Sequence, residues 1–206
     1  MRQLLVYSDD LSWGRMPVDG ERLTFEKRWP GVLENALTVS GLNVRVIEDC
    51  LIGRCAGADN PKAAGRFAMS TLPLALETHA PVELVILMLG YHDIHSLNSE
   101  VPALAEHLSA LVKQVRIAPH LPGMPTPDVL LVSPLLEKRV QQDELNVALK
   151  QVCEQDNCHF FESSKVLEEA HQGVCLEEQG HFTLGIALAD AVGEWLSQHF
   201  VDSHWQ

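Results

Sequence analysis

The feature of this chain that most restricts its fold is a regular alternation between short apolar runs and longer amphipathic segments. The apolar runs are rich in Val, Ile and Leu and lack strict apolar–polar alternation, which is typical of strands covered on both faces. The strands that this pattern predicts are Gln3–Ser8, Asn43–Glu48, Val82–Leu89, Asp128–Ser133 and His159–Glu162.

Segments with helical periodicity lie between these strands. Apolar residues at helical spacing mark one face over residues 104–115 and another over residues 189–196. Because strands and helices alternate along the chain, the sequence predicts a five-stranded parallel sheet with helices on both faces, a three-layer α/β/α fold. It contains no internal repeat, low-complexity tract or linker, so we predict a single domain over residues 1–206.

The composition excludes several classes of partner. A hydrophobic fraction of 46% and a charged fraction of 21% are ordinary for a soluble globular protein. The formal net charge of −13 would repel nucleic acid and anionic membranes, and no basic run opposes it. The apolar start of the chain is too short for a signal-peptide core, and no run approaches the roughly 20 residues that span a bilayer. We therefore expect a cytoplasmic protein that binds neither nucleic acid nor membranes.

The cysteines point to a reducing compartment. There are five, an odd count that favours free thiols over a disulfide framework. Four residues separate Cys50 from Cys55, and four separate Cys153 from Cys158. Structural zinc sites favour tighter spacings between their cysteines. We interpret these residues as buried thiols and expect neither a metal nor a cofactor.

Functional residues of an open parallel sheet collect at the carboxyl ends of its strands. This rule selects Ser8–Gly14, Asp49–Cys55 and Gly90–His95, which follow the first three predicted strands. Glu177–Thr183 precedes the last predicted helix and could reach the same edge. The sequence thus directs the search for chemistry to four segments.

These segments resemble the conserved blocks of the SGNH (GDSL-type) hydrolases, most closely their arylesterase-like and thioesterase-like members. Ser8–Gly14, with the sequence SDDLSWG, resembles the family's GDSLTWG, and Leu87–Asp93 resembles its Gly-x-Asn-Asp block. Val46–Arg54 resembles the second block, and Glu178–Thr183 resembles the final Asp-x-x-His block. Arg28–Leu33 also matches a stretch common in this subgroup, so the similarity runs from about residue 3 to residue 195.

The resemblance implies a flavodoxin-like SGNH hydrolase fold and an enzyme that hydrolyses small acyl or aryl esters or thioesters. Carried over by position, it places Asp10 at the nucleophile, His181 at the base and Glu178 at the orienting acid. It also places Gly53 and His92 at the glycine and asparagine positions that bind the oxyanion. Only Gly53 and His181 are the residues that the family has there.

Aspartate at position 10 changes the chemistry most. A carboxylate is a weak nucleophile toward an ester, and acylation would give a high-energy mixed anhydride. Its charge would also fill the group of donors that should receive the oxyanion. Ser8 and Ser12 flank Asp10, but either would need a register shift to replace it.

Three interpretations of the altered site remain open. Asp10, His181 and Glu178 could displace a leaving group at saturated carbon, with Asp10 forming an alkyl ester. The protein could instead be a catalytically degenerate family member that binds a ligand. A metal held by Asp10, His92, His95 and His181 is the third. We expect Asp10 and His181 to form an ion pair or a close hydrogen bond, which would raise the pKa of His181.

Overall fold

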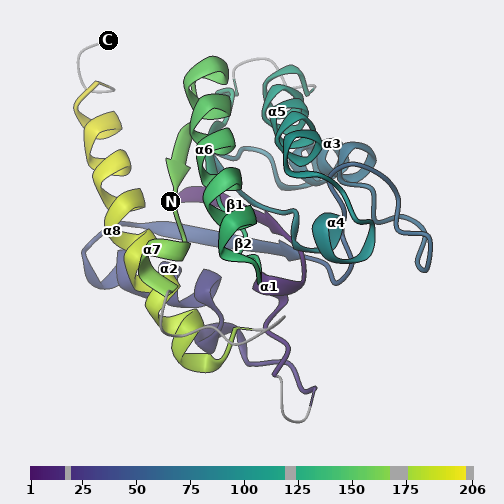
Figure 1. The fold of residues 1–206 in the computed structure, drawn as a ribbon. Helices are drawn as coiled ribbons and strands as arrows, with labels where there is room; N and C mark the ends of the chain where they lie inside the picture. Colours follow the sequence, from purple (N-terminus) through teal and green to yellow (C-terminus); the bar gives the residue numbers. More distant parts are fainter. Residues whose placement is uncertain (17–19, 119–123, 168–175, 203–206) are drawn as a thin grey trace.

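A parallel five-stranded sheet runs through the middle of the protein, as the computed structural model shows (Figure 1). The structure describes residues 1–16, 20–118, 124–167 and 176–202. Every neighbouring pair of strands is parallel, and their order across the sheet is β2-β1-β3-β4-β5. This is the flavodoxin-like order that we predicted. The strands are β1 (Arg2–Ser8), β2 (Val44–Cys50), β3 (Leu84–Met88), β4 (Asp128–Val132) and β5 (His159–Phe161).

Helices cover both faces of the sheet, which confirms the three-layer prediction. Figure 1 shows α3, α5 and α6 together on one face, and α2 and α8 together on the other. Among the described residues, no helix has both the length and the apolarity to cross a membrane. The helices are α1 (Asp10–Trp13), the 3-10 helix η1 (Phe25–Lys27), α2 (Trp29–Val39), α3 (Ala68–His79), α4 (Tyr91–Ser96), α5 (Val101–Ile117), α6 (Arg139–Asp156), α7 (Ser164–Leu167) and α8 (Glu178–Asp202).

Two apolar layers result, one on each face of the sheet. Alternate residues of a strand point to opposite faces, so Leu5 packs toward α3 and α5 while Leu4 packs toward α2 and α8. The predicted apolar face of α5 is fully used, because every one of its members is almost completely buried: Leu104, Leu108, Leu111, Val112 and Val115. The strands are thus apolar on both faces because both faces are covered.

A buried ion pair fixes the start of α2 against β2. Arg28, the residue before α2, donates from Nε to Oε1 of Glu48 at 2.7 Å and from Nη2 to Oε2 at 2.5 Å. Both side chains are only 9% exposed. Arg28 also donates to the Leu23 carbonyl, so its guanidinium has partners on two segments. This pairing sets the position of Trp29, the first residue of α2.

We predict that Glu48→Gln lowers the free energy of unfolding by about 3 kcal/mol, because it leaves the Arg28 guanidinium buried without a counter-charge. The matched control is Glu83→Gln, which breaks the Arg2–Glu83 pair, whose side chains are 24% and 33% exposed. That change should cost less than about 1 kcal/mol. Urea unfolding of the parent and both variants measures the difference. Equal losses in the two variants would contradict the prediction.

Candidate active site

The buried carboxylate of Asp9 joins the loops that follow β1 and β3. Asp9 is 0% exposed and accepts hydrogen bonds from the backbone N–H of Leu11 at 3.3 Å and of Gly90 at 3.2 Å. The first bond caps α1, and the second reaches the residue that precedes α4. Burial, and secondarily the nearby charge of Asp10, raise the pKa of Asp9 well above its usual value. Asp9 therefore supports the site from beneath.

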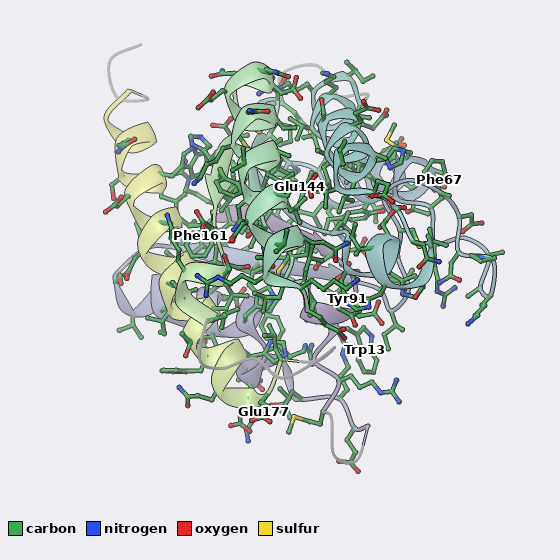
Figure 2. The ribbon with its side chains drawn as sticks, viewed as in Figure 1. Trp13, Phe67, Tyr91, Glu144, Phe161 and Glu177 are labelled. Atoms are coloured by element: carbon green, nitrogen blue, oxygen red, sulfur yellow. The ribbon has the colours of Figure 1, made fainter. Side chains whose placement is uncertain are left out.

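Asp93 joins the loop after β2 to the same edge. Its side chain is also 0% exposed, and its two oxygens accept from the backbone N–H of Ala56 at 2.9 Å and of Gly57 at 2.8 Å. Because Asp93 lies in α4, these bonds bring the loop that carries Gly53 next to the loop that carries His92. Tyr91 is the first residue of α4, and Trp13 is the last residue of α1. Figure 2 shows the two residues near each other, since α1 and α4 are in contact.

The structure brings Asp10 and Gly53 into direct contact. The Gly53 N–H donates to Asp10 Oδ2 at 2.7 Å, so the carboxylate occupies the donor that the resemblance assigns to an oxyanion. Gly53 has a φ of 73°, in the left-handed region that favours glycine. A Cβ at this position would also lie 2.7 Å from Asn60 Nδ2. Both the backbone angle and the close approach of Asn60 require glycine here.

Asn60 determines how His92 presents its ring. Asn60 Oδ1 accepts from the Lys62 N–H at 2.9 Å, so its amide nitrogen faces Gly53 O and His92 Nε2, each at 3.0 Å. Because Asn60 donates, His92 Nε2 must accept, and the ring proton belongs on Nδ1. That Nδ1 lies 3.5 Å from the Ser96 hydroxyl and 3.9 Å from Asp10 Oδ2. The His92 ring is thus near the Asp10 carboxylate but beyond hydrogen-bond distance of it.

His181 lies deeper than the resemblance suggested. Its ring is 0% exposed, and Nδ1 accepts from the Trp29 backbone N–H at 3.3 Å. Nε2 is buried and has no hydrogen-bond partner among the described residues. Burial, and secondarily the charge of Arg28, lower the pKa of His181 to about 4. The predicted rise through an ion pair with Asp10 is therefore wrong: the ring meets a backbone N–H and lies near a cation.

Glu178 is at the surface. It is the first residue of α8, its side chain is 51% exposed, and its Oε2 lies 3.0 Å from Lys27 Nζ. A carboxylate in the first turn of a helix is stabilised by the helix dipole. No hydrogen bond between Glu178 and His181 occurs in the part of the chain that the structure describes. The structure does not place Glu178 as the orienting acid.

The residues of the predicted metal site do not lie together. His95 Nε2 lies 3.7 Å from Glu137 Oε1, and its ring packs on Tyr91 with centroids 4.3 Å apart. Within the described ranges, no three His, Cys, Asp or Glu side chains gather closely enough to hold a metal. His92 and His95 therefore point to different partners, and the four-residue metal arrangement is not assembled.

Ser8 and Ser12 do not replace the missing nucleophile. Both are 0% exposed, and their hydroxyl oxygens lie 2.5 Å apart. Ser8 Oγ donates to the Met88 carbonyl at 2.6 Å, and Ser12 Oγ accepts from Trp29 Nε1 at 2.8 Å. Rotating either hydroxyl toward the site would break buried hydrogen bonds. The two serines form a structural network beneath Asp10.

The chain is similar to solved esterase structures over almost its whole length. The aryl esterase of M. smegmatis is 31% identical, with 94% of this chain and 99% of that chain covered and a TM-score of 0.82. A carbohydrate acetylesterase from Sinorhizobium meliloti is 28% identical, with 95% and 100% covered and a TM-score of 0.85. A psychrotrophic esterase from Pseudoalteromonas sp. is 18% identical with a TM-score of 0.70, a likeness of fold. No protein-family model and no curated protein sequence matches the chain.

We predict that His181 makes the protein less stable in mild acid. In the unfolded chain its ring takes up a proton near the ordinary value of 6.5, whereas the folded ring resists protonation down to about 4. The free energy of unfolding is therefore unaffected above the unfolded pKa and falls as pH decreases toward the folded one, by about 3 kcal/mol in total.

His181→Gln tests this, because the Gln amide does not titrate in this pH range. The variant should lose less stability than the parent between about pH 7 and pH 4 in urea unfolding followed by tryptophan fluorescence. His79→Gln, at the partly exposed end of α3, is the control. A parent and a His181→Gln variant with parallel pH profiles would refute the prediction.

Proposed function

Because this chain belongs to the SGNH (GDSL-type) hydrolase family, we propose that it hydrolyses small acyl or aryl esters or thioesters, with Asp10 serving as a base rather than as a nucleophile. The observation that supports this most directly is the hydrogen bond that the Gly53 N–H donates to the Asp10 carboxylate at 2.7 Å. It lies at the carboxyl edge of the sheet, the edge where ligands of open α/β folds bind. The side chains of Asp10 and His92 are 21% and 19% exposed, so solvent reaches both.

The reaction that suits this geometry uses water. The Gly53 N–H holds Asp10 Oδ2, which leaves Oδ1 to take a proton from a water molecule. The resulting hydroxide attacks the carbonyl carbon, and the His92 Nδ1–H donates to the developing oxyanion. The tetrahedral intermediate then expels the alkoxide, aryloxide or thiolate, which receives the proton from Asp10. No acyl-enzyme forms, so the mixed anhydride that excludes nucleophilic attack by Asp10 does not arise.

His181 has a positioning role in this scheme. Its buried ring accepts from the Trp29 N–H at the start of α2, and no hydrogen bond or ion pair joins it to Asp10 among the described residues. The hydrogen-bonded contact between base and nucleophile that a serine would need is therefore not formed in the parent protein. A carboxylate that activates water directly does not depend on that contact.

A catalytically degenerate ligand-binding protein is the second candidate. The same hydrogen bond also favours this candidate. The Gly53 N–H already donates to Asp10, so it is not free to donate to the carbonyl oxygen of a substrate. The two candidates differ in whether the parent protein turns over an ester at all.

We predict that the parent hydrolyses an activated aryl acetate slowly and that Asp10→Asn reduces the rate by about a hundredfold or more, because a general base contributes about that much. The amide is isosteric and its oxygen can still accept from the Gly53 N–H. Asp190→Asn, an exposed position on α8, is the control for loss of a carboxylate. Initial rates with folding checked by circular dichroism measure the effect. A parent rate equal to that of Asp10→Asn would favour the ligand-binding candidate.

We also predict that Asp10→Ser combined with His92→Asn converts the mechanism to acyl transfer. The two changes release the Gly53 N–H and restore the family's nucleophile and third oxyanion donor. Rapid-mixing kinetics should then show a burst of aryl alcohol, whereas the parent shows none. A triad nucleophile is typically worth on the order of a million-fold, so even poor alignment leaves a detectable gain. A folded double variant without a burst would mean that His181 cannot serve position 10.

A further inference from the structure

The junction between α6 and β5 brings two cysteines together. Asn157, which ends α6, adopts a left-handed conformation with φ 51° and ψ 52°. The Cys158 N–H then donates to the Cys153 carbonyl at 3.0 Å, which closes the last turn of the helix. In this type of helix end, the side chains of the two bonded residues pack against each other. β5 begins at the next residue, so the junction lies at the edge of the sheet opposite Asp10.

We propose that Cys153 and Cys158 are a modification site that forms a reversible intramolecular disulfide on exposure to a hydroperoxide. Both are free thiols in this structure, and the backbone bond from Cys158 to Cys153 places them on adjoining turns of the chain. Cys153 Sγ donates to the carbonyl of His159, the residue after Cys158, at 3.3 Å. Cys153 is 6% exposed and packs in the apolar layer beside α5, whereas Cys158 is half-buried. The pair therefore combines one thiol that an oxidant can reach with one behind it that can resolve the product.

The surroundings of Cys158 favour its thiolate. Arg116 Nη2 donates to the Asn157 carbonyl at 2.6 Å, which holds a guanidinium one residue away from Cys158. The neighbouring Cys153 thiol, and then the charge of Arg116, lower the pKa of Cys158 against the effects of burial, Asp156 and Asp128. The effect of Asp156 is limited because Lys113 lies 3.3 Å from it.

The reaction balances with the hydroperoxide as the only oxidant. The Cys158 thiolate attacks the terminal oxygen, an S–O bond forms, and the O–O bond breaks to release an alkoxide that takes up a proton. Cys153 then attacks the sulfenic sulfur: the S–S bond forms, the S–O bond breaks, and the hydroxide leaves with the proton of Cys153 as water. Two thiols and one hydroperoxide thus give a disulfide, an alcohol and water.

Cys50 and Cys55 have the same spacing in the sequence, but their surroundings do not favour oxidation. Cys50 ends β2, and Cys55 lies beyond the turn that contains Gly53, with its Sγ 3.3 Å from the Gly53 carbonyl. Burial raises the pKa of Cys55 to about 12 and that of Cys50 well above its usual value. Neither thiol is disposed to ionise, so we expect oxidation to select Cys158.

The test is peptide mapping of the full-length protein after treatment with hydrogen peroxide and alkylation of remaining thiols. Cys153 and Cys158 lie in one tryptic peptide, residues 151–165, whereas Cys50, Cys55 and Cys175 lie in three others. The peptide 151–165 should lose about 2 Da and both alkylation sites, and a thiol reductant should restore them. Cys175 lies outside the described residues, so a cross-link from peptide 151–165 to its peptide would overturn the proposal.

Two variants keep the result decisive. Cys153→Ser should trap a sulfenic acid at Cys158 that a dimedone probe labels, and Cys158→Ser should leave Cys153 unlabelled because it is buried. Cys50→Ser is the matched control and should form the disulfide like the parent. Oxidation of Cys50 or Cys55 before the 151–165 peptide, or dimedone labelling of Cys153 in Cys158→Ser, would overturn the assignment.

Discussion

Two buried carboxylates hold the candidate site together. Asp9 reaches from the loop after β1 to the Gly90 N–H, and Asp93 reaches from α4 to two N–H groups in the loop after β2. The loop after β2 is also joined to the end of β1, because the Leu51 N–H and the Arg54 side chain both donate to the Ser8 carbonyl. The two aspartates add the connections to the loop after β3, and so fix Gly53 and His92 relative to Asp10. The geometry of the site is thus set by aspartates that do not take part in the chemistry.

The same framework bears on the mechanism that we propose for Asp10. The hydrogen bond from Gly53 depends on the position of its loop, which Asp93 holds through the N–H groups of Ala56 and Gly57. An aspartate therefore meets a donor already positioned for an anion and binds it. His181 is held separately, by the start of α2, whose own position depends on the Arg28–Glu48 pair. The parts of the site are supported independently, so one can change while the others persist.

Sequence periodicity predicted the five strands and the two helical layers, because burial on both faces leaves a strong apolar signal. The contact between Asp10 and Gly53 was also predictable, since strand ends in a parallel sheet meet. The burial of His181 was not, because it depends on where α8 begins and on the Trp29 N–H, which no local pattern encodes. Asn60 was missed for a similar reason: its effect on His92 crosses from one loop to another, and only an Asn-Pro pair marked it as a turn.

The occupied Gly53 N–H has a consequence for inhibitors. Boronates and phosphonates act on serine esterases because they place a negative charge in a hole of N–H donors. Here such a compound would place its charge within hydrogen-bond distance of the Asp10 carboxylate, without a free Gly53 donor to offset the repulsion. A cationic or amide-bearing ligand meets the opposite situation, because the carboxylate accepts from it. The charge preference that follows for this site is thus the reverse of that expected of a serine esterase.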